Sequence, residues 1–339
     1  MFGGLASGIE PALSLKGGRM IAVKRRWIMA RGMLLVLIAV ALTTGLRGEN
    51  RKEETVRPVK LADKPELLYG IYGNGLEKPV GVALDERGYV YVADAGSHQI
   101  KVFSPGGRPV MAFGKPGTEP GQLNYPYGLA FTPEGELLVS DPANERVSIY
   151  SRKGHFLKTL VSGGNDLGLI RPGGLTVKGD VIYISDLWGH QIVVVDGQGK
   201  LVRRIGRPGS GGGELRYPQS VAIDDQGRLW VADAGNNRIQ VFDKEGNFLF
   251  MIGGENSPVS FGLLRGIAID NLQRVLIADS INSTIRVFDP EGKELFSFGG
   301  YGEEETQFIY PIGLAVGEDG KIYVADRGNQ RVQVWGYRR

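Results

Sequence analysis

The chain of 339 residues holds 40 basic and 37 acidic residues, 52 glycines and no cysteine. The absence of cysteine excludes disulfide bonds, thiolate metal sites and cysteine nucleophiles. The formal net charge of +3 comes from the first 46 residues, because residues 47–339 hold 34 basic and 36 acidic side chains. A nucleic-acid-binding domain is expected to carry net positive charge, so nucleic acid is not expected as a partner.

The N-terminal part of the chain carries a membrane signal. Basic residues 24–26 and Arg31 accompany an apolar stretch over residues 28–46. The 19 residues of this stretch approach the length of a membrane span. An uncleaved transmembrane anchor and a cleaved signal peptide both remain open. Basic residues before the span predict a cytoplasmic segment 1–27 and an extracytoplasmic remainder, either membrane-anchored or secreted or periplasmic after cleavage.

Residues 47–63 are polar and charged, which predicts a linker. The remainder, residues 64–339, is repetitive. Aspartates that each close a short β-rich run recur at intervals of 45 to 47 residues: Asp94, Asp141, Asp186, Asp233, Asp279 and Asp326. A β-type repeat of this period indicates a propeller or a solenoid.

The fourth repeat shows four strands, predicted at 218–224, 228–233, 238–243 and 248–253, with Gly- and Asn-rich turns between them. Four antiparallel strands form one propeller blade. The six repeats therefore predict an all-β fold, a six-bladed β-propeller of four-stranded antiparallel blades preceded by one hydrophobic signal or anchor segment.

The two ends of the repeat region predict how the ring closes. The sixth repeat stops after its third strand, and an extra strand of the fourth type lies at residues 66–72. We expect residues 66–72 to pair with residues 331–335, so that an N-terminal strand closes the ring and removes its open edges.

The pattern V-A-D-x-x-N-x-R-[IV]-x-V-[FW], preceded by P-x-G-[ILV]-A, resembles the NHL repeat family of six-bladed propellers. The runs that begin at Asp233 and Asp326 match it almost fully, and the run that begins at Asp141 matches well. Three units depart from the pattern at its arginine, with Gln99, Gln191 and Thr284. The resemblance implies a propeller over residues 64–339 and leaves the activity open, because this fold hosts lyases, sensors and binding modules.

The repeated aspartates and the arginines Arg146, Arg238 and Arg331 are expected to be structural. A strand-end aspartate can accept backbone N–H groups of its turn, and an arginine can pair with it. A catalytic residue is needed once, whereas a structural residue is needed in every blade.

A variable position lies four residues after each aspartate: His98, Glu145, His190, Asn237, Ser283 and Gln330. We expect these residues in the turns between second and third strands, on one face near the channel mouth. Histidine and carboxylate groups with an open position suit a catalytic metal. The peptidyl-hydroxyglycine lyases, which resemble NHL propellers, bind zinc through channel histidines. In this chain we expect no cofactor, because His155 is predicted on the opposite face and no third histidine is available at the channel mouth. The alternative is zinc or calcium bound by His98, Glu145 and His190.

We expect a membrane-tethered extracytoplasmic module that binds or scaffolds a protein, peptide or glycan, and we assign no catalytic residue. The candidate ligand-binding face carries His98, Glu145, Trp188, His190, Asn237 and Gln330. Tyr125, Tyr217 and Tyr310 precede first-strand prolines, and Tyr and Trp are common at binding hot spots. The alternative is a metal-dependent lyase or hydrolase with a channel-mouth site resembling that of the peptidyl-hydroxyglycine lyases.

Overall fold

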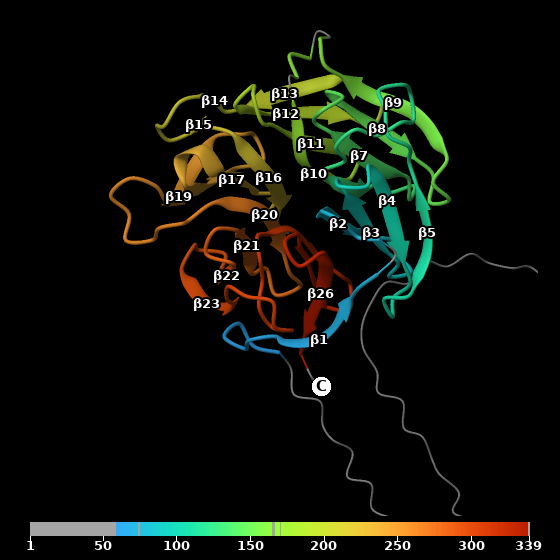
Figure 1. The fold of residues 1–339 in the computed structure, drawn as a ribbon. Coiled ribbons are helices and arrows are strands. Elements are labelled where there is room, and N and C mark those ends of the chain that lie inside the picture. The colour runs from blue at the N-terminus through green and yellow to red at the C-terminus, as the bar shows by residue number, and fades with distance from the viewer. Residues whose placement is uncertain (1–58, 74, 165–166, 170, 338–339) are drawn as a thin grey trace, which may run out of the picture. The chain divides into compact units, whose positions relative to one another are not determined.

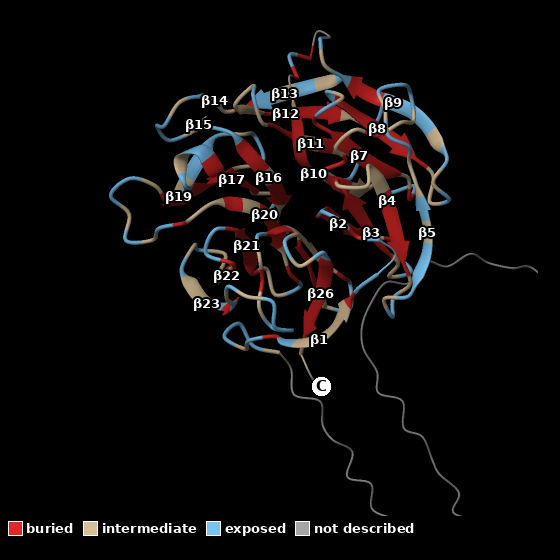
Figure 2. Ribbon diagram, viewed as in Figure 1, coloured by how far each residue is buried: buried red, intermediate tan, exposed pale blue. Residues whose placement is uncertain are grey.

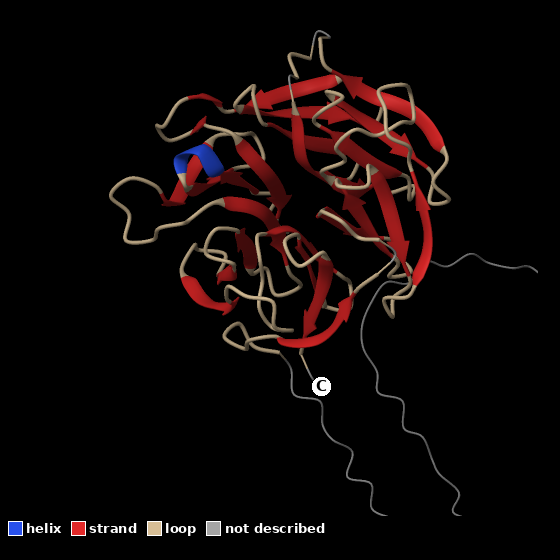
Figure 3. Cartoon of the chain, in the orientation of Figure 1, coloured by secondary structure: helices blue, strands red, loops and turns tan. Residues whose placement is uncertain are grey.

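The computed structural model describes residues 59–337 apart from 74, 165–166 and 170. Six four-stranded antiparallel sheets lie around a centre as the blades of a propeller (Figure 1). Nearly all of the regular structure is strand, and the described residues contain one short 3-10 helix, η1 (Ala234–Asn236) (Figure 3). The predicted all-β, six-bladed architecture is confirmed.

Each of the first three blades runs outward from the centre in chain order. Blade 1 comprises β2 (Pro79–Leu84), β3 (Val90–Asp94), β4 (Gln99–Phe103) and β5 (Pro109–Phe113). Blade 2 comprises β6 (Leu129–Phe131), β7 (Leu137–Asp141), β8 (Arg146–Tyr150) and β9 (Phe156–Ser162). Blade 3 comprises β10 (Pro172–Lys178), β11 (Val181–Asp186), β12 (Gln191–Asp196) and β13 (Leu201–Ile205).

Blades 4 and 5 also run outward in chain order, whereas blade 6 has the N-terminal strand as its outermost strand. A short parallel pair, β14 (Arg207–Pro208) and β15 (Glu214–Leu215), precedes blade 4. Blade 4 comprises β16 (Pro218–Ile223), β17 (Leu229–Asp233), β18 (Arg238–Phe242) and β19 (Phe248–Gly253). Blade 5 comprises β20 (Leu264–Ile269), β21 (Val275–Asp279), β22 (Thr284–Phe288) and β23 (Glu294–Gly299). Blade 6 comprises β24 (Pro311–Val316), β25 (Ile322–Asp326), β26 (Arg331–Gly336) and β1 (Glu66–Ile71).

The core lies between neighbouring blades. The second and third strands of a blade, such as β17 and β18, are buried along their whole length, whereas the outer strand β5 is largely exposed (Figure 2). Middle strands are covered on both faces by adjacent blades, so their sequences can be apolar at consecutive positions and need not alternate between apolar and polar residues. The predicted period-two pattern therefore holds best in the outer strands.

The N-terminal strand closes the ring as predicted. In blade 6, β1 pairs antiparallel with β26, with Glu66 opposite Gly336 and Ile71 opposite Val332. Ile71 packs in a buried cluster with Val332 and Tyr323. The two ends of the repeat region thus share one sheet, and an apolar cluster fixes their register.

The end of the predicted linker is attached to the ring. Arg274, which is almost fully buried, pairs through Nε with Asp270 at 2.7 Å. Its Nη1 donates to the carbonyl oxygens of Leu61 at 3.1 Å and Asp63 at 3.0 Å. The predicted linker over residues 47–63 therefore ends in a segment held by a buried guanidinium, which the polar composition of that segment did not reveal.

The predicted anchor at residues 28–46 lies outside the described residues, as does segment 1–27. Within the part of the chain that the structure describes, no helix is long and apolar enough to cross a membrane.

The closure generates a prediction about stability. Replacing Ile71 with alanine removes a fully buried side chain from the joint between β1 and β26, and should lower the free energy of unfolding by about 2–5 kcal/mol. The matched control is Val110→Ala on the exposed strand β5, which should change it by less than about 0.5 kcal/mol. Urea denaturation measures both, and equal effects would contradict closure by this strand.

Candidate functional site

One end of the ring gathers the turns that the repeat pattern singles out. In every blade except blade 2, the start of the first strand pairs with the aspartate that ends the second strand, as in Pro79 with Asp94 and Pro218 with Asp233. We call this end the mouth face. It comprises residues 77–80, 95–98, 124–127, 142–145, 171–173, 187–190, 216–219, 234–237, 262–265, 280–283, 309–312 and 327–330.

The strand-end aspartates are buried and hold the loop that enters their own blade. Asp94 accepts backbone N–H groups of Glu77 at 3.0 Å and Lys78 at 2.7 Å. Asp233 accepts the backbone N–H of Arg216 at 2.6 Å. We expected each aspartate to accept donors from its own turn, as Asp186 does from Gly189. Donors from 15 to 17 residues upstream add to those of the turn, because the incoming loop also contacts the carboxylate.

The repeated arginines complete this attachment. Arg238 pairs through Nε with Asp233 at 2.8 Å. Its Nη atoms donate to the carbonyl oxygens of Ser210, Gly211 and Glu214 in the preceding loop at 2.6–2.8 Å. Arg331 makes the equivalent contacts, to Asp326 and to the loop around residues 303–307. Arg146 donates through its Nη atoms to the loop around residues 118–122, but its Nε has no hydrogen-bond partner among the described residues.

The units that depart from the arginine pattern supply other donors. Lys101 lies 2.7 Å from Asp94 and Arg286 lies 3.9 Å from Asp279, each seven residues after its aspartate. In blade 3 the amide of Gln191 donates to the carboxylate at 3.3 Å. The sequence pattern has its arginine five residues after the aspartate. Lys101 and Arg286 lie two positions further along the third strand and reach the same carboxylates, so the pattern did not identify them.

This arrangement predicts unequal roles for two arginines of one blade. Arg238→Ala leaves a buried carboxylate and three loop carbonyls without their donor, and should cost about 3–5 kcal/mol of stability. Arg207→Ala removes a guanidinium whose side chain is 79% exposed and pairs with Glu214, and should cost less than about 1 kcal/mol. Thermal and urea denaturation of the two variants test this, and a mild effect of Arg238→Ala would contradict the structural role.

The six variable positions share one backbone conformation. His98, Glu145, His190, Asn237, Ser283 and Gln330 all have φ between 50° and 56°. This left-handed region costs an ordinary residue roughly 1–2 kcal/mol. Since all six turns adopt it, the conformation is a requirement of the turn and does not by itself mark a functional residue.

The side chains at three of these positions reach toward the next blade. His98 Nδ1 contacts the carbonyl oxygen of Asn124, and His190 Nδ1 accepts the backbone N–H of Tyr217 at 3.0 Å. Glu145 Oε1 lies 3.9 Å from a terminal nitrogen of Arg171. Among the described residues no three histidine, aspartate or glutamate side chains form a group able to hold a metal. The structure therefore does not gather His98, Glu145 and His190 into one ligand set, because each is directed at its own neighbouring loop.

A pocket of about 410 Å³ opens on the mouth face and reaches from blade 1 to blade 5. It brings two predicted residues, His98 and Trp188, together with Arg171, Tyr127 and Arg265. The other predicted face residues, Glu145, His190, Asn237 and Gln330, lie on the same face outside this lining.

Sequence reasoning missed the residues at the floor of the pocket. Arg265 Nη1 donates to Gln219 Oε1 at 2.6 Å, and the Tyr127 hydroxyl donates to the same oxygen at 2.9 Å. Burial raises the pKa of Tyr127, so its hydroxyl remains a donor at neutral pH. These residues occupy the position after the first-strand proline, where the six units differ: Val80, Tyr127, Gly173, Gln219, Arg265 and Ile312. That variation between nearly constant neighbours is the signal that would have found them.

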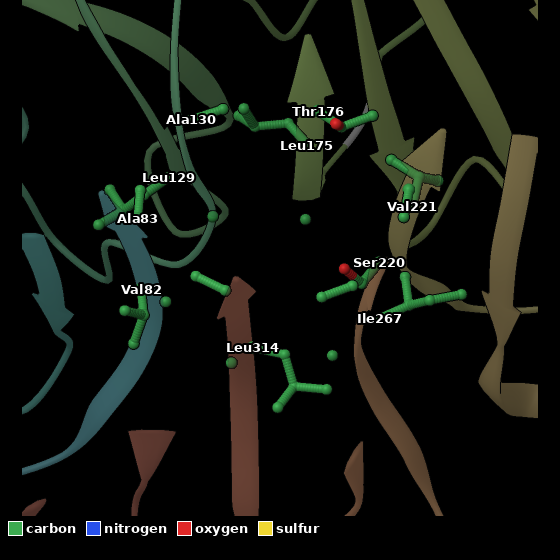
Figure 4. A pocket seen from close by; sticks show the side chains of 18 of the residues that line it. Val82, Ala83, Leu129, Ala130, Leu175, Thr176, Ser220, Val221, Ile267 and Leu314 are labelled. Atoms are coloured by element: carbon green, nitrogen blue, oxygen red, sulfur yellow. The ribbon is translucent and has the colours of Figure 1, made fainter. Parts of the chain in front are cut away.

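The central channel below this network is lined mainly by small and aliphatic residues, together with Thr176, Ser220 and Arg265. It has a volume of about 330 Å³ and is lined by the innermost strands. Figure 4 shows Val82, Leu175, Val221 and Leu314, from four different blades, around this space. No histidine, aspartate or glutamate lines it in the described chain, so the polar chemistry of the site lies at the mouth.

The mouth face carries exposed aromatic side chains, of which Trp188 also lines the pocket. Trp188, Tyr217 and Tyr310 are 44–52% exposed. Tyr217 and Tyr310 have φ of 48° and 51°, an unusual conformation for a bulky residue that costs about 1–3 kcal/mol. The His190 ring meets the Tyr217 ring edge-on at 4.6 Å, and Arg171 stacks on Trp188 at 3.6 Å. His190 and Arg171 thus contact the rings of Tyr217 and Trp188, which remain partly exposed to solvent.

Comparisons with known proteins agree with this architecture. The NHL repeat model matches residues 76–103, 215–242 and 308–335. The chain is 29% identical over 185 residues to protein brain tumor of Drosophila melanogaster, covering 55% of this chain and 13% of that protein. It is 33% identical over 99 residues to a probable peptidyl-alpha-hydroxyglycine alpha-amidating lyase of Caenorhabditis elegans, covering 26% of this chain and 28% of that protein.

Both relatives extend well beyond the matched segments. Among solved structures, a streptogramin B lyase aligns with a TM-score of 0.59 at 16% identity, over 79% of this chain and 96% of that one, which supports the fold alone. The described ring is therefore a six-bladed β-propeller that contains NHL repeats at three positions.

Proposed function

We propose that this protein is a binding or scaffolding module that docks a protein, peptide or glycan on its mouth face. The observation that carries the proposal is the combination of a formed pocket of about 410 Å³ with half-exposed aromatic side chains beside it. Binding sites are concave and are lined by aromatic groups with a few placed polar groups. Trp188 with Arg171, above the donors Tyr127 and Arg265, fits that description.

The conformation of the tyrosines supports the same proposal. Tyr217 and Tyr310 adopt a backbone conformation that glycine adopts at little cost, yet their rings lie about half in solvent. Because the two tyrosine side chains are about half exposed, their contacts with the rest of the propeller offset little of the free energy that this backbone conformation costs. Strained residues of this kind gather at sites that bind ligands.

The entry point of the chain leaves the mouth face open. Strand β1 begins opposite Gly336 and ends opposite Val332, whereas β26 begins just after the mouth-face turn 327–330. The chain therefore enters the ring at the end opposite the mouth face. As part of the proposal, residues 28–46 tether the protein to a membrane, with the ring on the extracytoplasmic side.

Replacing Trp188 with alanine and Tyr217 with glycine in one variant tests the proposal. Partner capture from a membrane fraction by the immobilised full chain in detergent should fall at least about tenfold, because aromatic anchors contribute most at binding sites. The melting temperature should hold or rise, since glycine relieves the left-handed conformation. Val110→Ala, which removes an exposed apolar side chain on β5 away from the mouth face, is the control. Unchanged capture by the double variant, measured by quantitative mass spectrometry, would exclude this face.

Similarity to the probable amidating lyase makes a metal-dependent lyase or hydrolase the second candidate. The separate contacts of His98 and His190 predict no stoichiometric metal after incubation of the untagged protein with zinc or calcium. Elemental mass spectrometry measures this. About one metal ion per chain, lost in His98→Ala or His190→Ala, would instead favour the enzyme.

A further inference from the structure

The mouth-face turns carry more basic than acidic side chains, although the neighbouring loop 300–308, which meets these turns at Ser283 and Asn329, adds Glu303, Glu304 and Glu305. The exposed and half-exposed turns of the mouth face carry five basic side chains, Lys78, Arg171, Arg216, Arg265 and Arg327. They carry two acidic side chains, Glu77 and Glu145. Residues 47–339 as a whole hold slightly more acidic than basic groups. The strand-end aspartates below do not cancel this charge outward, because they are buried and bonded to the incoming loops and to donors of their own blades.

Two of these arginines line the pocket, and the guanidinium of one of them is partly open to solvent. Arg171 stacks on Trp188, and its side chain is 29% exposed. A terminal nitrogen of Arg171 lies 3.9 Å from Glu145, which is beyond hydrogen-bonding distance. Arg265 is oriented by Gln219 at the floor. An anionic group in this pocket would therefore meet two oriented guanidinium groups and an aromatic wall.

We infer that the pocket recognises a carboxylate side chain of an acidic peptide segment in a protein partner. This inference rests on the proposed binding function and gives its ligand a chemical class. A guanidinium pairs in the plane with a carboxylate and can stack on an aromatic ring at the same time, as Arg171 does on Trp188. The apolar part of the peptide would lie on Trp188 and Tyr125, both of which line the pocket.

The structure favours a peptide over a nucleic acid. A volume of about 410 Å³ accommodates one or two side chains. Glu77 and Glu145 interrupt the basic surface, and a continuous phosphate backbone would meet them. Nucleic-acid binding draws most of its affinity from an extended positive surface, whereas an isolated carboxylate needs only the paired arginines.

Fluorescence anisotropy with the full chain in detergent tests the inference. The probe is a fluorescein-labelled peptide of alternating glutamate and tyrosine, compared with the same peptide carrying glutamine for glutamate and with an oligouridylate of equal length. The acidic peptide should bind at least about tenfold more tightly than the glutamine peptide. Added salt should reduce this difference in affinity, because it screens the attraction between the arginines and the glutamates.

Three matched variants locate the binding. Arg171→Gln and Arg265→Gln should each weaken binding of the acidic peptide about tenfold. Arg216→Gln makes the same charge change on the mouth face outside the pocket lining, and should weaken it less than about twofold. The backbone N–H of Arg171 that holds Asp186 remains in the variant, and circular dichroism melts check that each variant is folded.

The inference would be overturned if the two peptides bound equally tightly, or if Arg171→Gln and Arg265→Gln left the affinity for the acidic peptide unchanged. The proposed binding function would then be tested by the capture experiment alone. Tighter binding of the oligouridylate, lost in both pocket variants, would overturn it in favour of a nucleic acid. Absence of binding by any probe, with partner capture intact, would also overturn the acidic-peptide assignment.

Discussion

A buried carboxylate at the end of the second strand is the constraint on which the ring depends. Each strand-end aspartate is at most 1% exposed and accepts backbone N–H groups of the loop that enters its own blade, as Asp94 does from Lys78. A buried charge is tolerated only when it is fully hydrogen-bonded. The chain must therefore bring the incoming loop, the second strand and a side-chain donor, such as Arg238 in blade 4 or Gln191 in blade 3, together in every blade. That requirement explains why the aspartate recurs in all six units.

The same constraint makes the mouth face a fixed platform. The turn after each aspartate passes through a left-handed residue such as His190, and the loop before each first strand is tied down. Side chains carried by these segments are consequently held on rigid elements, which favours precise binding sites. The scaffold uses the repeated positions, and the differences between blades fall at positions such as Tyr127, Gln219 and Arg265, which together build the floor of one pocket.

Charge shows how a repeat fold can hide a site from composition. The acidic and basic residues of residues 47–339 nearly balance, yet two arginines from different blades, Arg171 and Arg265, line one pocket. The repeat makes this possible, because one blade position is presented six times around a common axis. A few substitutions, such as Arg171 in blade 3 and Arg265 in blade 5, then add up in space although 94 residues separate them in the sequence.

The sequence by itself determined the six blades, their strand order and the closing pair of β1 with β26, because strand periodicity, turn residues and repeat length are local properties of the chain. It also placed His98 and Trp188 on one face. Only the tertiary structure showed that His98 and His190 contact separate loops, that Lys101 replaces the missing arginine of blade 1, and that Arg171 meets Arg265 in one pocket. These relations join different strands or blades, and their distances depend on the curvature and packing of the ring, which no single repeat encodes.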